Sequence, residues 1–128
     1  MLFIDTGAFL ARYLARDANH GRAAALWEEI SDRPCFTSNH VLDETFTLLG
    51  RRSTYTFAAA RAERSRDLEI LYASRDGEIE AVRLFRKFAD QKVSFTDCVS
   101  FALMRRFRLV KAFSFDDHFR RAGFVLFS

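Results

Sequence analysis

The 128-residue sequence has only two cysteines, Cys35 and Cys98, far apart along the chain. That number excludes a disulfide framework, and the spacing excludes a local metal clip. No apolar run approaches the roughly 18 residues of a membrane helix, and no basic segment precedes an apolar stretch at the N-terminus. We therefore expect a soluble, cytoplasmic protein with reduced thiols and no membrane association.

Several catalytic motifs are also missing. The five glycines do not form a loop that cradles phosphate, and no serine lies in a nucleophile elbow. The three histidines, His20, His40 and His118, include no helical pair at the spacing of zinc ligands. These absences disfavour a P-loop enzyme, a serine hydrolase and a zinc enzyme.

Apolar and basic residues are plentiful. Hydrophobic residues make up 49% of the chain, which is enough for a core, and the length suits one domain over residues 1–128. The formal net charge is +3, and 17 of the 20 basic residues are arginines. Arginine favours phosphate recognition because its planar fork bonds two oxygens at once. The alternative is a solvated surface that reflects genome base composition, and charge alone does not decide between them.

Apolar runs of strand length alternate with segments of helical periodicity. The runs predict strands at 1–4, 35–37, 67–72, 109–115 and 124–127. The periodic segments predict a helix that includes residues 9–14, and further helices at 20–30, 39–50, 54–66, 76–89, 97–108 and 116–122. This alternation is typical of an α/β fold with a parallel sheet covered by helices on both faces.

Four acidic residues occupy the places where the apolar runs end or the helices begin. Asp5 and Asp116 follow predicted strands, Asp97 starts a predicted helix, and Glu44 lies near the apolar face of another. Because ligands bind at the carboxyl ends of parallel strands, acids placed there can converge on one spot. Clustered carboxylates repel one another unless a cation is bound.

Hard divalent cations such as Mg²⁺ and Mn²⁺ prefer oxygen ligands of this kind. A cation held there can activate water and stabilise charge at phosphorus, which favours nuclease chemistry. Each acid also has a structural alternative: a helix cap for Asp5 and Asp97, a salt bridge for Glu44 and a turn for Asp116. The order of all four along the chain carries more weight than any one of them.

Four short motifs occur in an order that resembles the PIN-domain ribonucleases, and most closely the VapC-type toxins. They are Ile4-Asp5-Thr6, the segment 37–44 with sequence TSNHVLDE, the segment 94–97 with sequence SFTD, and the segment 113–119 with sequence FSFDDHF. The resemblance covers essentially the whole chain. It implies a three-layer α/β/α sandwich that cleaves RNA with Mg²⁺ or Mn²⁺, often as a homodimer inhibited by a cognate antitoxin.

The resemblance also implies roles for the acids. Asp5 and Asp97 become direct metal ligands, and Asp116 a direct or water-mediated one. Glu44 becomes a ligand of a second metal or a residue that aligns the attacking water. The neighbouring Asp117 leaves open which carboxylate of the pair faces the site.

Six arginines are candidates for contacts with the RNA backbone, since phosphate contacts supply affinity without base specificity. They are Arg51, Arg52, Arg105, Arg106, Arg120 and Arg121. Two other functions stay open beside the toxin. One is a PIN-domain nuclease of RNA processing or decay without an antitoxin, and the other is a non-catalytic binding module on the same fold.

Overall fold

The computed structural model describes residues 1–65 and 68–128. Its centre is a five-stranded sheet with the order β3-β2-β1-β4-β5, in which every pair of neighbours is parallel. The strands are β1 (Leu2–Ile4), β2 (Cys35–Ser38), β3 (Glu69–Leu71), β4 (Lys111–Phe113) and β5 (Val125–Phe127). The predicted parallel α/β sheet is therefore confirmed.

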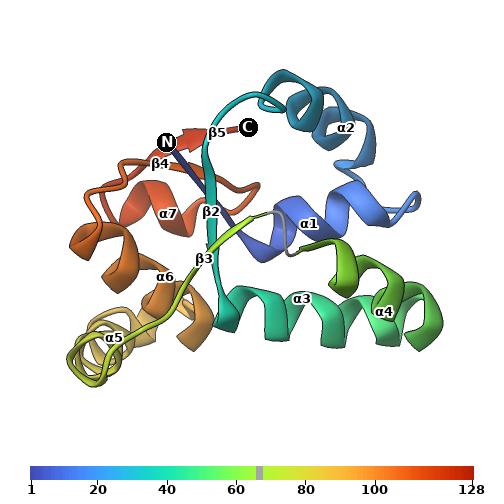
Figure 1. The fold of residues 1–128 in the computed structure, drawn as a ribbon. Coiled ribbons are helices and arrows are strands. Elements are labelled where there is room, and N and C mark those ends of the chain that lie inside the picture. The colour runs from blue at the N-terminus through green and yellow to red at the C-terminus, as the bar shows by residue number, and fades with distance from the viewer. Residues whose placement is uncertain (66–67) are drawn as a thin grey trace.

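Helices connect the strands and cover the sheet on both faces (Figure 1). They are α1 (Thr6–Tyr13), α2 (His20–Glu29), α3 (Asn39–Arg52), α4 (Tyr55–Arg64), α5 (Arg75–Lys87), α6 (Phe95–Arg106) and α7 (His118–Arg121), with a 3₁₀ turn at Ala89–Gln91. In Figure 1, α1, α2 and α4 lie on one side of the strands and α5, α6 and α7 on the other. This is the predicted three-layer arrangement.

The strand order reverses between β1 and β4. The chain moves outward from β1 through β2 to β3, then returns across the sheet to place β4 on the free side of β1. In open α/β sheets the crevice at the carboxyl ends of the two strands flanking such a switch point is where ligands bind. The fold thus singles out the ends of β1 and β4.

The short strands of the sheet are held by burial on both faces. Phe3 in β1 and Phe113 in β4 are fully buried, and Phe101 from α6 packs edge-on against Phe119 from α7 with ring centroids 5.1 Å apart. Such continuous apolar burial is what a parallel sheet between two helical layers requires. It fixes the strand ends, and with them the backbone of the residues that follow.

Most element boundaries lie close to the predicted ones, but α6 begins at Phe95 instead of 97, α7 begins at His118 instead of 116, and β4 is shorter than predicted. The predicted strand 109–115 is shortened to Lys111–Phe113, and it begins late because Arg108 adopts a left-handed conformation, with φ 56°, and the amide of Leu109 donates to Met104 O at 2.8 Å. Leu109 therefore closes α6 instead of opening the strand. The predicted helix end at Arg66 and strand start at Asp67 lie outside the described residues. Among those described, no helix has the length and apolar character to cross a membrane.

Candidate active site

The four predicted acids line one cavity of about 350 Å³ at the switch point of the sheet. Asp5 directly follows β1, and Asp116 lies just beyond β4. Asp97 lies in the first turn of α6, and Glu44 lies in α3. Four segments far apart in the sequence thus contribute one carboxylate each to the same hollow.

Asp5 is buried, with 5% of its surface exposed. Its Oδ2 accepts a hydrogen bond of 2.9 Å from Ser114 Oγ, whereas its Oδ1 is buried without a partner among the described residues. Burial, and next the charge of Asp97, raise the pKa of Asp5 to about 8. A buried carboxylate oxygen without a donor is costly, so it marks a place where a ligand belongs.

Asp97 is the electrostatic centre of the group. Ser94 caps α6 by accepting a hydrogen bond from the Asp97 amide at 3.1 Å, which fixes the acid in the first turn. Burial, followed by the charges of Asp116 and Glu44, raises the pKa of Asp97 to about 7. Three neighbouring carboxyl groups, including Asp5, therefore act on this one side chain.

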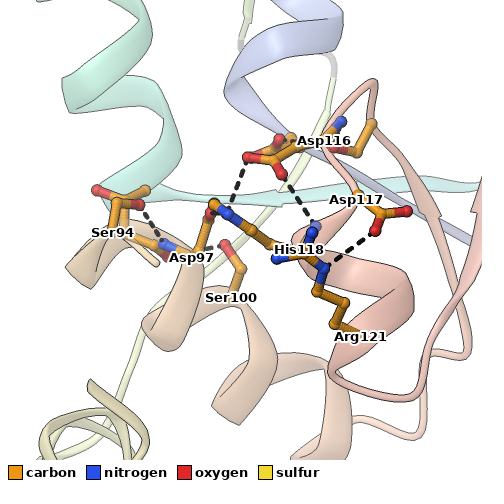
Figure 2. A network of polar contacts seen from close by, with 10 residues as sticks. Ser94, Asp97, Ser100, Asp116, Asp117, His118 and Arg121 are labelled. Carbon is orange, nitrogen blue, oxygen red and sulfur yellow. Dashed lines mark hydrogen bonds and ion pairs between the residues drawn. The ribbon is translucent and has the colours of Figure 1, made fainter. Parts of the chain in front are cut away.

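Asp116, and not Asp117, faces the cavity. Asp116 Oδ1 accepts from the His118 amide at 2.9 Å, and Oδ2 lies 3.0 Å from His118 Nδ1. Asp117 instead pairs with Arg120 and, at 3.1 Å, with Arg121 on α7. Figure 2 shows Asp97, Asp116 and His118 directed toward one another and Asp117 joined to Arg121. The geometry thus distinguishes the two aspartates of the doublet.

We expect Asp116→Asn to lower the rate of RNA cleavage by at least about tenfold, because it removes a charge that a bound cation needs. Asp117→Asn is the matched control on the adjacent residue. It breaks only exposed ion pairs, which contribute about 0–1 kcal/mol to stability, and should cleave RNA at close to the unmodified rate. Initial cleavage rates of the two variants, measured side by side, check this. Equal losses in both would contradict the assignment of Asp116.

Glu44 is half-buried in α3, and its carboxylate has no ion-pair partner among the described residues. The alternative that Glu44 forms a structural salt bridge is therefore not supported by the described part of the chain. Glu44 also lines a second hollow, of about 390 Å³, together with His40 and Arg51. The acidic cavity thus continues along α3 toward a basic side chain.

Two ionisable residues among those described in the lining of the cavity were not predicted as site residues from the sequence. His118 follows Asp116 by two positions, and its Nδ1 lies 3.2 Å from Asp97 Oδ2. Lys92 lines the cavity from the loop after the 3₁₀ turn, with a left-handed φ of 56°. The position of His118, two residues after Asp116, could have indicated a site residue, but nothing in the sequence singled out Lys92.

The residues present fit a divalent cation. Ligand atoms from Asp97, Asp116 and His118 lie within 4.8 Å of one another. Oδ1 of Asp5 and the hydroxyl of Thr6, neither of which has a hydrogen-bond partner among the described residues, are buried in the lining of the same cavity. Carboxylate, hydroxyl and imidazole groups together form a donor set that a cation would satisfy, and its charge would relieve the mutual repulsion of the acids.

The six candidate arginines are dispersed over the molecule. Arg51 lines the hollow next to the cavity, and Arg52 lines a separate pocket near α1. Arg105 donates to Ala122 O at 3.2 Å and, with Arg106, lies at the end of α6 remote from Asp97, about 12 Å along the helix axis. Arg120 and Arg121 pair with Asp117. Of the six, Arg51 is the one that adjoins the acids.

Comparison with known families and proteins extends this description. Residues 2–125 match the model of the PIN domain. The 23S rRNA-specific endonuclease VapC20 of Mycobacterium tuberculosis is 39% identical over 129 residues, which cover 98% of this chain and 96% of the relative. A VapC ribonuclease of Archaeoglobus fulgidus is 31% identical over 127 residues, covering 91% of this chain and 77% of the relative.

Two solved structures share the fold. The crystal structure of Mycobacterium tuberculosis VapC20, described as a sarcin–ricin loop cleaving toxin, superposes with a TM-score of 0.89 at 38% identity and covers 98% of this chain and 97% of that one. The crystal structure of FitAcB from Neisseria gonorrhoeae superposes with a TM-score of 0.74 at 14% identity, over 100% of this chain and 97% of that one. At that identity the second likeness concerns the fold alone.

Proposed function

Because this chain belongs to the PIN domain family and resembles VapC ribonucleases over nearly its whole length, we propose that it is an endoribonuclease toxin that hydrolyses RNA phosphodiester bonds with a divalent cation. The observation that carries the proposal is the convergence of Asp5, Glu44, Asp97 and Asp116 on one cavity. All four acids of the motif are present, which disfavours a non-catalytic binding module.

The chain's own residues supply the positions for this chemistry. Asp5, Asp97 and Asp116 would hold the cation: Asp5 and Asp97 are buried and repel each other, Asp5 has an oxygen without a partner among the described residues, and the more exposed Asp116 adds a third carboxylate beside Asp97. A bound Mg²⁺ or Mn²⁺ supplies charge at the phosphate and lowers the pKa of a water molecule. Glu44, which is half-buried on α3, would orient the attacking water. Thr6 adds a hydroxyl donor to water or phosphate.

Lys92 binds the phosphate of the substrate. It is the only lysine or arginine among the described residues lining the cavity, whose other charged groups would repel RNA. A point charge at the rim offsets that repulsion and adds affinity without base specificity. Arg51, in the adjoining hollow, extends the same positive surface along α3.

We expect Lys92→Gln to lower kcat/KM for RNA cleavage by about tenfold, mainly through KM, and to reduce the salt dependence of binding by about one phosphate contact. Lys87→Gln is the control, since Lys87 is exposed at the end of α5 and does not line the cavity. Steady-state kinetics at two or more salt concentrations measure both effects. Equal kinetic constants in both variants would show that Lys92 does not bind the substrate.

We propose 23S rRNA as the substrate, cut in the sarcin–ricin loop, because the M. tuberculosis relative is named for this target and is alike over nearly the whole chain. The test is to incubate purified protein with ribosomes and with a synthetic loop RNA in Mg²⁺ or Mn²⁺. EDTA and Asp5→Asn serve as controls. A single metal-dependent cut in the loop supports the proposal. Cleavage of other RNA alone would keep the ribonuclease and reject this target.

We also propose a cognate antitoxin and a homodimer, as expected for this class of toxin. Exposed apolar residues on α5, namely Ile79, Val82 and Phe85, support the view that the chain has protein partners, because contiguous apolar surface tends to mark interfaces. Mass determination in solution tests the dimer. The antitoxin is supported if expression of the protein arrests growth and co-expression of a small neighbouring gene relieves the arrest. Unaffected growth favours a nuclease of RNA processing.

A further inference from the structure

We propose that His118 is a nitrogen ligand of the cation, beside Asp97 and Asp116, and that it makes the site favour Mn²⁺ over Mg²⁺. This inference rests on the proposed metal-dependent function and specifies its cation. Among the described residues that line the cavity, His118 is the one that lies between the acids and offers a nitrogen atom instead of oxygen to a metal.

Two hydrogen bonds fix the backbone of the turn that carries His118. Asp116 N donates to Ser114 Oγ at 3.0 Å, and His118 N donates to Asp116 Oδ1 at 2.9 Å, so the turn before α7 is closed by two hydrogen bonds. Only 22% of the His118 side chain is exposed. A ring fixed in this way has its direction decided before any ligand arrives.

His118 Nδ1 points at the carboxylates instead of the solvent. It lies 3.0 Å from Asp116 Oδ2 and 3.2 Å from Asp97 Oδ2. Adjacent ligand atoms around an octahedral ion with bonds of about 2.1 Å are about 3 Å apart, so these spacings suit a shared cation. Without the cation the ring N–H donates to these oxygens. With a cation bound, Nδ1 would be its ligand and the ring proton would reside on Nε2.

A second, independent feature directs a cation to the same cavity. Asp5 is 95% buried, and its Oδ1 has no partner among the described residues. Asp97, Asp116 and the His118 imidazole pair with one another, as Figure 2 shows, so these three groups alone would not require a cation. Oδ1 of Asp5 is not satisfied in this way, and it needs a cation or a donor from outside the described part of the chain.

The donor type determines the preference between ions. Mg²⁺ is bound almost wholly by oxygen and loses water reluctantly, whereas imidazole favours first-row transition ions. A site with one nitrogen among its carboxylates therefore gains more from Mn²⁺ than from Mg²⁺. A site with the four acids alone has no such reason to discriminate.

The test uses metal binding to the full-length chain in the absence of RNA. We expect electron spin echo spectra of the Mn²⁺-loaded protein to show coupling to ¹⁴N, which ¹⁵N labelling of histidine replaces by ¹⁵N coupling. We also expect calorimetry to show tighter binding of Mn²⁺ than of Mg²⁺. In His118→Gln, Mn²⁺ affinity should fall about tenfold or more while Mg²⁺ affinity stays within about twofold.

His40→Gln is the matched control, since His40 lies in the adjoining hollow and pairs with Glu78 at 3.0 Å. It should leave the nitrogen coupling and both affinities unchanged. Absence of histidine coupling in the unmodified protein, or equal losses of both ions in His118→Gln, would overturn the proposal. The labelled, unmodified protein tests for the nitrogen ligand even where the variant fails to fold. Failure of RNA cleavage with intact Mn²⁺ coupling would count against the proposed function alone.

Discussion

Asp97→Asn should lower the rate of RNA cleavage by about 10³-fold. The same substitution should make the metal-free protein more stable at pH 8, raising its Tm by about 5 °C. Asp97 interacts with the charges of Asp5, Asp116 and Glu44, so its carboxylate is costly without a cation and indispensable with one. The amide keeps the shape and an acceptor for His118, but removes the charge. Loss of activity with gain of stability is characteristic of a residue kept for function.

Cleavage assays and thermal melts in EDTA and in Mn²⁺ measure both effects. Asp90→Asn, at an exposed acid in the 3₁₀ turn, is the control and should change neither activity nor Tm appreciably. The unmodified protein should gain Tm on addition of Mn²⁺, and Asp97→Asn should not. If the variant cleaved RNA normally, or melted earlier than the unmodified chain in EDTA, Asp97 would not be the centre of a cation site.

The metal-free protein should lose stability as the pH rises from 5 to 8.5, by an amount on the order of a few kcal/mol. Asp5 has a pKa of about 8 and Asp97 about 7, both raised from 3.8 by burial and then by neighbouring carboxylates. At pH values above 3.8 and below these raised pKa values, the folded protein keeps protons that the unfolded chain has released. The free energy of unfolding therefore decreases with pH across this window and is highest near its acidic end.

Urea unfolding in EDTA at a series of pH values measures this dependence. Asp5→Asn should flatten the curve, because one of the two shifted groups is gone while the acceptor for Ser114 Oγ is retained. Saturating Mn²⁺ should also reduce the slope, since the cation stabilises the charged carboxylates. A stability that rose toward pH 8.5 in EDTA would show that these acids are not held in the repelling arrangement.

The location of the site was readable from the sequence because strands and acids follow one another in order. A carboxylate directly after a buried strand, as at Asp5, must lie at the carboxyl edge of a parallel sheet. For Asp97 the sequence predicted a helix that begins at this residue, whereas the structure begins α6 at Phe95 with Ser94 as its cap, which places Asp97 in the first turn. Local rules of this kind need no knowledge of distant contacts.

The doublet at 116 and 117 could not be resolved in the same way. Two adjacent aspartates have equal claims until the turn before α7 directs one carboxylate into the cavity and the other toward Arg120 and Arg121. Arg105 likewise has the composition of an RNA contact, but its guanidinium is bonded to Ala122 O, which lies 17 residues further along the chain. Side-chain direction depends on neighbours that only folding supplies.

The sequence by itself determined the parallel α/β sheet, because hydrophobic periodicity is a property of short segments, and its four short motifs carried the resemblance to the PIN-domain family. It predicted Asp5, Glu44 and Asp97 as site residues and left the choice between Asp116 and Asp117 open. Only the tertiary structure decided which atoms meet: the unpartnered oxygen of Asp5, the imidazole of His118 between two carboxylates, and Lys92 at the rim. These arrangements arise from packing between segments that are far apart along the chain. Their energies depend on burial and on distances of a few ångströms, which no local pattern encodes.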